Sequence, residues 1–193
     1  MKQDTKQKII ETGAKVIHHK GYHHTGIQEI LTAANVPKGS FYFYFASKED
    51  FGLHVIDYYN TLYMKMVSPI ITDSSIKPLE KINQLLDWFI HMFVDMEYQC
   101  GCPIGNLSQE MGDLSPVFSD KLVDSVNLIV TIYQDLLEQA RQDEDIPADL
   151  DPRETADFIV SSWHGALIKM KIVKNATPLE NHKSFILRLL AWK

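Results

Sequence analysis

The sequence predicts an all-α fold in which a small three-helix domain, residues 1–48, precedes a larger helical domain, residues 49–193. Apolar residues recur along most of the chain at the three- and four-residue spacing of amphipathic helices. Residues with helix-capping or helix-ending chemistry separate these apolar segments. The chain has 193 residues, of which 45% are hydrophobic, and this is enough to build a core at such a length.

The charge is distributed unevenly along the chain. Residues 1–50 carry seven lysines and five acidic residues, a net charge of +2, whereas residues 51–193 carry twelve basic and twenty acidic residues, a net charge of −8. This asymmetry favours contact with nucleic acid through the first domain alone. No run of about 18 apolar residues occurs and no apolar signal region follows the charged start, so we expect a cytoplasmic protein with no membrane partner.

The first predicted helix covers residues 4–20 and ends at Gly21. The next begins at about Gly26, where Thr25 and Gln28 have the spacing of a capping box. Asn35 ends that helix, because asparagine tolerates the left-handed backbone found just past a helix end. Four histidines, at positions 18, 19, 23 and 24, leave a metal site open, but their spacing shows no convergent ligand set. We predict no metal and no cofactor.

A short helix from Pro37 to about Tyr44 follows the corner. At about 100° per residue, Phe41 and Phe45 share one face and Phe43 points away from them. So short a helix cannot bury aromatic side chains on every side, so some of residues 42–44 face outward. Two helices joined by a tight corner suit insertion of the second into the major groove of DNA. Gly39 keeps the start of this helix slim, which allows close approach of the backbone.

The rest of the chain reads as further helices. Ser47 to Asp50 caps a helix that is predicted to end before Ser68-Pro69, because proline lacks an amide hydrogen. The later helices are predicted at residues 79–98, 106–111, 116–141, 152–174 and 179–192. The helix over 79–98 has apolar residues around most of its circumference. The last two have broad apolar faces, which makes them a candidate subunit interface.

Residues 25–50 resemble the DNA-binding domain of TetR/AcrR-type transcriptional regulators, and the resemblance covers about the first 55 residues. Gly21 and Tyr22 close the preceding helix in the family manner. The residues that match the family pattern are Thr25, Ile27, Ile30, Ala33, Ala34, Val36, Lys38, Gly39, Ser40, Tyr42, Phe45, Lys48 and Leu53. The departures are Asn35 where glycine is usual, Pro37 where serine or threonine caps the helix, and Phe43-Tyr44 where histidines are common.

The resemblance implies a repressor that binds a palindromic operator in double-stranded DNA as a homodimer and releases it when a small-molecule effector enters the second domain. No enzymatic activity is implied. We expect Ser40 and Phe43 near base edges, with Gly39 at the close approach. The predicted phosphate contacts are Thr25, Lys38, Tyr42, Tyr44 and Lys48. The predicted effector site draws on aromatic and sulfur-containing side chains, which suit an adaptable pocket but also an ordinary core: Trp88, Met92, Met96, Cys102, Phe118, Tyr133 and Trp163.

The segment from Cys100 to Asp113 looks like that of a TetR subgroup whose members respond to electrophiles through the cysteine matching Cys102. A cysteine near a helix start has its thiolate stabilised by unpaired amides, which favours reaction at neutral pH. The alternative is an inert, packed cysteine. Two other functions stay open, a thiol-dependent enzyme that uses Cys102 and a helical scaffold without DNA binding. No Ser/His/Asp or Cys/His spacing supports the enzyme.

Overall fold

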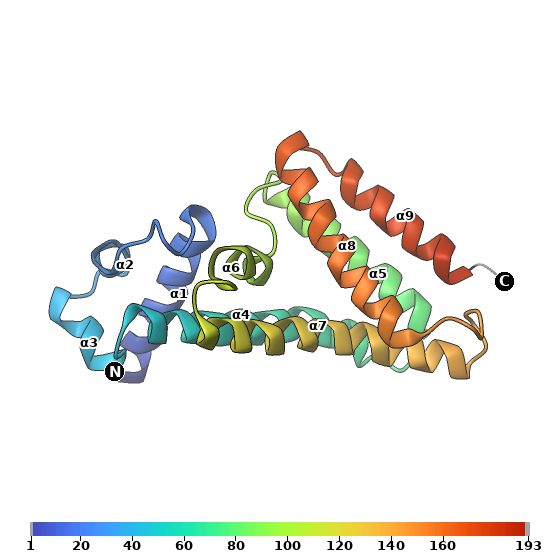
Figure 1. The fold of residues 1–193 in the computed structure, drawn as a ribbon, viewed down its shortest axis with the longest axis horizontal. Helices are drawn as coiled ribbons and strands as arrows, with labels where there is room; N and C mark the ends of the chain where they lie inside the picture. Colours follow the sequence, from blue (N-terminus) through green and yellow to red (C-terminus); the bar gives the residue numbers. More distant parts are fainter. Residues whose placement is uncertain (1, 192–193) are drawn as a thin grey trace. The chain divides into compact units, whose positions relative to one another are not determined.

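The computed structural model describes residues 2–191, with side chains from residue 4 onward, and the regular elements of this part are all helical. The prediction of an all-α fold is therefore confirmed. Figure 1 shows the helices in chain order. Their bounds are α1 Lys2–Lys20, α2 Ile27–Ala33, the 3-10 helix η1 Lys38–Ser40, α3 Phe41–Tyr44, α4 Lys48–Ile71, α5 Pro78–Asp95, α6 Pro103–Met111, α7 Pro116–Gln142, α8 Pro152–Val173 and α9 Thr177–Ala191.

The chain forms two compact units that each combine segments distant in the sequence. The first unit contains Met1–Met64 and Pro103–Ser125, and the second contains Lys65–Cys102 and Val126–Lys193. This division does not follow the sequence boundary expected at residue 48, because α6 and the start of α7 pack with the N-terminal helices. α4 and α7 each contribute residues to both units.

In the first unit, α2 ends as predicted but begins differently. Asn35 has a φ of 51°, and the Val36 amide donates to the Leu31 carbonyl at 3.0 Å, so the helix end has Schellman geometry. The predicted capping box is wrong. Gly26 is the N-cap and no side chain caps the helix. The Thr25 hydroxyl instead donates to the Gly21 carbonyl at 2.7 Å, in a buried position that favours a partner inside the protein.

The segment after the corner divides its aromatic residues between core and solvent as predicted. Phe41 and Phe45 are buried, and their ring centroids lie 5.6 and 5.0 Å from that of Phe51 on α4. Tyr42 and Phe43 are 69% and 65% exposed. The helix expected over residues 37–44 consists of η1 followed by α3. The buried phenylalanines therefore anchor α3, and the Tyr42 and Phe43 side chains between them face solvent.

Helix α4 begins where predicted and ends later. The Ser47 hydroxyl accepts a hydrogen bond from the Asp50 amide at 3.0 Å, which confirms the predicted cap. The end predicted before Pro69 is wrong, since α4 continues to Ile71 with the proline inside it. Proline removes only its own amide donor, and the Thr72 amide still reaches the Ser68 carbonyl at 3.0 Å, so the last turn persists.

The second unit brings α5, α8 and α9 together, and α9 lies alongside both α8 and α5 (Figure 1). α5 ends at Asp95 rather than Tyr98, and Glu97 and Tyr98 adopt positive φ in the turn that follows. The prediction that α5 is apolar around most of its circumference does not describe its packing. One face is buried and the other is exposed, including Trp88. α6 begins at Pro103, earlier than expected, and Trp192 lies outside the described residues.

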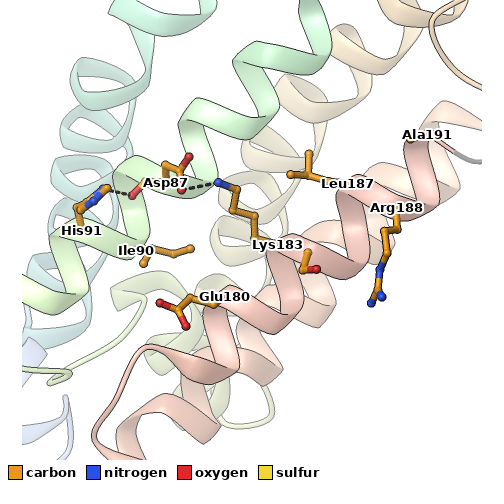
Figure 2. Close-up of a pocket in the computed structure, with 9 residues that line it drawn as sticks. Asp87, Ile90, His91, Glu180, Lys183, Leu187, Arg188 and Ala191 are labelled. Carbon is orange, nitrogen blue, oxygen red and sulfur yellow. Dashed lines mark hydrogen bonds and ion pairs between the residues drawn. The ribbon is translucent and has the colours of Figure 1, made fainter.

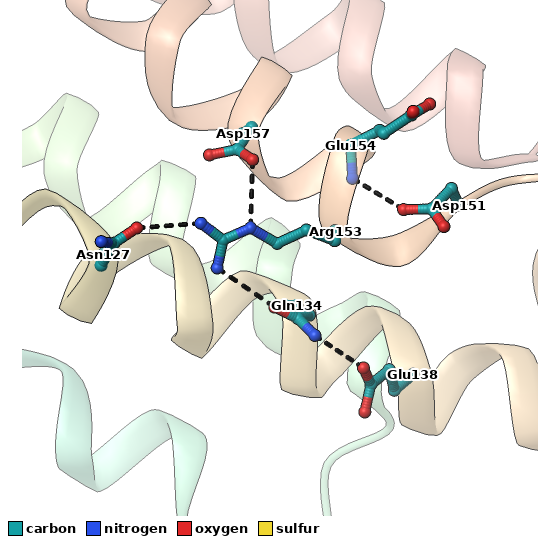
Figure 3. Close-up of polar contacts among 7 residues, drawn as sticks. All are labelled: Asn127, Gln134, Glu138, Asp151, Arg153, Glu154 and Asp157. Carbon is teal, nitrogen blue, oxygen red and sulfur yellow. Dashed lines mark hydrogen bonds and ion pairs between the residues drawn. The ribbon is translucent and has the colours of Figure 1, made fainter.

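Polar contacts join α7 to the start of α8 within the second unit (Figure 3). The Arg153 guanidinium donates to Asn127 Oδ1 at 2.9 Å and to Gln134 Oε1 at 3.5 Å, and its Nε donates to Asp157 at 3.1 Å. The Asp151 carboxylate caps α8 by accepting from the Glu154 amide at 2.8 Å. The planar Arg153 guanidinium donates to three acceptors at once, and this restricts how α8 can lie against α7.

Candidate DNA-binding surface and effector site

Helix α3 and the residues around it present the predicted reading surface on the first unit. Lys38, Gly39, Tyr42 and Phe43 are exposed, and Ser40 and Tyr44 are half-buried. A Cβ placed on Gly39 would have no heavy atom within 4 Å, so the space before this residue is open. Seven of the eight predicted DNA contacts, all except Thr25, lie in the sequence segment from Lys38 to Lys48, and four of them are exposed in the structure.

The exposed aromatic rings are held by their neighbours. The Tyr42 ring stands edge-on to Phe41, with centroids 5.4 Å apart and an interplanar angle of 83°. The Phe43 and Tyr44 rings are similarly arranged at 4.9 Å and 86°. Such edge-to-face contacts restrict ring motion and lower the entropy lost on binding. Phe43 has no hydrogen-bonding group, so any contact it makes with a base edge is apolar.

Lys48, at the start of α4, has a well-defined environment. Its ammonium donates to the Tyr22 carbonyl at 2.6 Å and lies 4.3 Å from the centroid of the Tyr22 ring. Burial lowers the pKa of Lys48, and the nearby Glu110 carboxylate opposes that shift. An ammonium has three donors, so the bond to Tyr22 leaves donors for a phosphate.

Thr25 is separate from this surface. It is buried, with its amide bonded to the Tyr22 carbonyl at 3.3 Å and its hydroxyl bonded to the Gly21 carbonyl. Its side chain therefore supports the turn before α2 and is covered, so its hydroxyl is not placed to reach a phosphate.

The seven predicted effector-site residues are divided between the two units and differ in burial. Phe118 belongs to the first unit, where it is buried with its ring 5.1 Å from that of Tyr22. Tyr133 is buried in the second unit, and burial raises the pKa of its hydroxyl. Trp163 is half-buried and lies edge-on to His182 at 5.2 Å. Trp88 is exposed on α5, and Met92 and Met96 are half-buried.

An open pocket of about 580 Å³ lies between α5 and α9 and is lined by none of those seven residues. Figure 2 shows Asp87 on α5 and Lys183 on α9 facing each other across it, and they form an ion pair of 2.5 Å. His91 Nδ1 lies 2.8 Å from the Asp87 carbonyl oxygen. The residues that line the pocket carry both positive and negative charge, including Glu180 and Arg188.

Neither cysteine is part of a disulfide, and both are half-buried in the second unit, beside the start of α6 in sequence. Cys100 has a φ of 62° and Gly101 a φ of 80°, so the chain turns sharply before Cys102. Burial raises the pKa of the Cys100 thiol, and Lys171 and Lys174 oppose that shift. Within the described residues, no group of three or more histidine, cysteine or acidic side chains is placed to hold a metal ion. In the same part of the chain, no helix is long and apolar enough to cross a membrane.

Glu110 on α6 is a residue that the sequence analysis missed. Its carboxylate accepts from the Tyr22 amide at 2.7 Å and the His23 amide at 3.2 Å, in the turn between α1 and α2. Eighty-eight residues separate Glu110 from Tyr22, and no local pattern links them.

Two family models match the chain. Residues 9–55 match "Bacterial regulatory proteins, tetR family", and residues 78–186 match "Tetracyclin repressor-like, C-terminal domain". The chain is 34% identical over 185 residues to the HTH-type transcriptional repressor DhaR of Mycobacterium sp. (strain GP1), and this match covers 96% of the chain and 91% of DhaR.

Two solved structures are similar along nearly the whole chain. The regulatory protein TetR from Rhodobacter sphaeroides superposes with a TM-score of 0.89 at 32% identity, over 95% of this chain and 97% of that one. The reduced form of Escherichia coli NemR superposes with a TM-score of 0.86 at 25% identity, over 98% of each chain. The chain belongs to the TetR family of bacterial DNA-binding transcriptional regulators.

Proposed function

We propose that the protein is a repressor that binds a palindromic operator as a homodimer and releases it when a small apolar or electrophilic effector binds. The observation that carries this proposal is the pair of exposed rings, Tyr42 and Phe43, on a short helix anchored by buried Phe41 and Phe45. Exposed aromatic side chains cost hydration free energy unless a partner covers them, and a DNA groove is a partner of suitable width.

The side chains divide by chemistry into phosphate and base contacts. Lys38, Lys48, Tyr42 and Tyr44 carry ammonium or hydroxyl donors for phosphate oxygens. Ser40 and Phe43 are assigned to base edges, with Phe43 suited to a thymine methyl group, the apolar feature of the major groove. The open space at Gly39 supports close approach of the backbone.

Operator binding and its salt dependence test the proposal. The wild-type protein should bind a palindrome from DNA upstream of its gene with two chains per operator, measured by fluorescence anisotropy. Lys48→Ala should weaken binding to every sequence and reduce the slope of log K against log salt by about one unit, because one phosphate contact is lost. Lys65→Ala, an exposed lysine further along α4, is the control and should leave the slope unchanged. Absence of specific DNA binding would contradict the proposed function, and an unchanged slope would remove Lys48 from the phosphate contacts.

Exposed apolar residues on α8 and α9 support the homodimer. Phe158 on α8 and Phe185 on α9 are about half exposed, and their ring centroids lie 6.3 Å apart. Ile168 and Ile172 follow Phe158 at helical spacing and are 42% and 76% exposed. Gly165, between Phe158 and Ile168 in sequence, has no heavy atom within 4 Å of a Cβ position, so no side chain covers the helix surface there. An exposed apolar face with this profile suits a copy of itself across a two-fold axis.

Cys102 is the proposed point of attack for an electrophilic effector. It precedes the first residue of α6, where unpaired helix amides stabilise a thiolate. That a relative's structure is titled as its reduced form supports a role for oxidation or thiol chemistry in this family.

Cys102→Ser should leave operator affinity unchanged and abolish release by N-ethylmaleimide, which adds to a thiolate through its carbon–carbon double bond. Cys100→Ser is the matched control. It should keep the response, because burial raises the pKa of the Cys100 thiol and lowers its thiolate fraction. Anisotropy of labelled operator measures release. If Cys102→Ser still released the operator, the cysteine would have a structural role only.

A further inference from the structure

The turn between α1 and α2 is bound by a carboxylate from far along the chain. Glu110, near the end of α6, accepts from the Tyr22 amide through Oε2 at 2.7 Å and from the His23 amide through Oε1 at 3.2 Å. Hydrogen bonds from amides to a carboxylate are charge-assisted and stronger than those between neutral groups. Both amides come just after the end of α1, at Lys20, where helical hydrogen bonding has stopped.

Gly21 makes room for this carboxylate. Its φ of +89° takes the chain out of α1 in a conformation that other residues rarely adopt. A Cβ at this position would lie 2.8 Å from Glu110 Oε1 and 3.3 Å from Oε2. Glycine is therefore needed twice, for the backbone conformation and for the space that the carboxylate occupies.

Tyr22 in this turn contacts residues of three helices of the first unit. Its amide is bound by Glu110 on α6 and its carbonyl accepts from the Lys48 ammonium on α4. Its buried ring packs edge-on against Phe118 on α7. Burial, with a smaller contribution from Glu49, raises the pKa of Tyr22 to about 12, so the ring stays neutral. Three groups of one turn residue, its amide, its carbonyl and its ring, are thus oriented at once.

This turn leads directly into the DNA-reading elements. α2 begins at Ile27, four residues after His23, and contacts α1. A tight corner joins α2 to η1 and α3, so a shift of the turn that moves α2 would also act on the segment that carries Tyr42 and Phe43. α6 belongs to the same compact unit as this turn, which makes Glu110 part of the DNA-binding body although it lies far away in sequence.

We propose that Glu110 is a positioning residue for operator recognition, because its carboxylate fixes the α1–α2 turn and thereby the placement of α3. This inference rests on the proposed DNA-binding function and assigns part of it to α6. Glu110 does not contact DNA itself.

The test compares Glu110→Gln with Asp113→Asn, which removes the same charge from an exposed position two residues past α6. Loss of a negative charge by itself raises affinity for DNA, so Asp113→Asn should bind operator as tightly as the wild type or slightly more tightly. Glu110→Gln should bind operator about tenfold more weakly or worse, against the electrostatic trend, because its amide group can replace only one of the two acceptor oxygens. Its salt slope should equal that of the wild type, since no phosphate contact is lost.

Two further readouts separate positioning from loss of folding. A partly unfolded variant loses operator and non-specific affinity in the same proportion, whereas a misplaced α3 lowers the ratio between them. Affinities are compared at a temperature where circular dichroism shows each variant folded. Nuclear magnetic resonance should show shifted Tyr22 and His23 amide signals in Glu110→Gln but not in Asp113→Asn.

If the wild type bound operator and Glu110→Gln bound it with the same affinity and specificity ratio, this inference alone would fail. If the wild type bound no DNA specifically, the proposed function would fail and this inference with it. An equal loss of operator and non-specific affinity would also overturn positioning, because it indicates a structural role.

Discussion

Phe41→Ala is expected to lower the free energy of unfolding of the first unit by about 3–5 kcal/mol, the usual range for removing a fully buried phenylalanine ring. Phe41 has no exposed surface, and its ring packs within 5.6 Å, centroid to centroid, of the rings of Phe45 and Phe51. Loss of the Phe41 ring leaves a cavity between α3 and α4. Because stability of small domains is of that same order, α3 should lose its anchor and operator binding should disappear.

Phe43→Ala is the matched control, the same substitution two residues away on the same helix. Phe43 is 65% exposed, so the free energy of unfolding should change by less than about 0.5 kcal/mol. Urea unfolding followed by circular dichroism, with amide hydrogen exchange in α3, measures both variants. Equal destabilisation by the two substitutions would contradict the division of the aromatic residues between core and reading surface.

Phe185→Glu is expected to convert the dimer into monomers and to weaken operator binding by about 10²–10⁴-fold, the range by which linking two binding modules raises avidity. Phe185 is half exposed on α9 beside Phe158 on α8. In the proposed dimer a glutamate here would bury a charge without a partner. Sedimentation velocity gives the oligomeric state, and anisotropy gives the affinity.

Val94→Glu controls for the added charge and for the loss of an exposed apolar side chain. Val94 is 41% exposed on α5, in the same unit as Phe185. This variant should remain a dimer with nearly unchanged operator affinity. A Phe185→Glu protein that stayed dimeric would place the subunit interface elsewhere on the chain.

Local chemistry carried much of the sequence-based prediction for the first unit. Asn35 marks the end of α2 because the left-handed backbone is a local requirement that few residues meet. Ser47 caps α4 because its hydroxyl accepts a hydrogen bond from the Asp50 amide, only three residues away. That Phe41 and Phe43 point in opposite directions follows from helical geometry, so their difference in burial could also be predicted from the sequence.

Predictions were wrong where the local sequence was compatible with more than one arrangement. Thr25 could accept from an α2 amide or donate to the Gly21 carbonyl, and burial of the turn decided for the second. Pro69 could end α4 or lie within its last turn, and the helix continues past it. The predicted effector residues stay a prediction, because an aromatic or methionine side chain suits both a core and a pocket, and sequence does not show which face of a helix is covered.

The sequence by itself determined the helices, their order, the corner before α3 and the family to which they belong, because helix periodicity and capping act over a few residues. Tertiary structure alone decided that α6 joins the DNA-binding body, since the contact of Glu110 with Tyr22 spans 88 residues. A carboxylate binds whichever amides the fold brings to it, and nothing in the spacing of the chain specifies which these are.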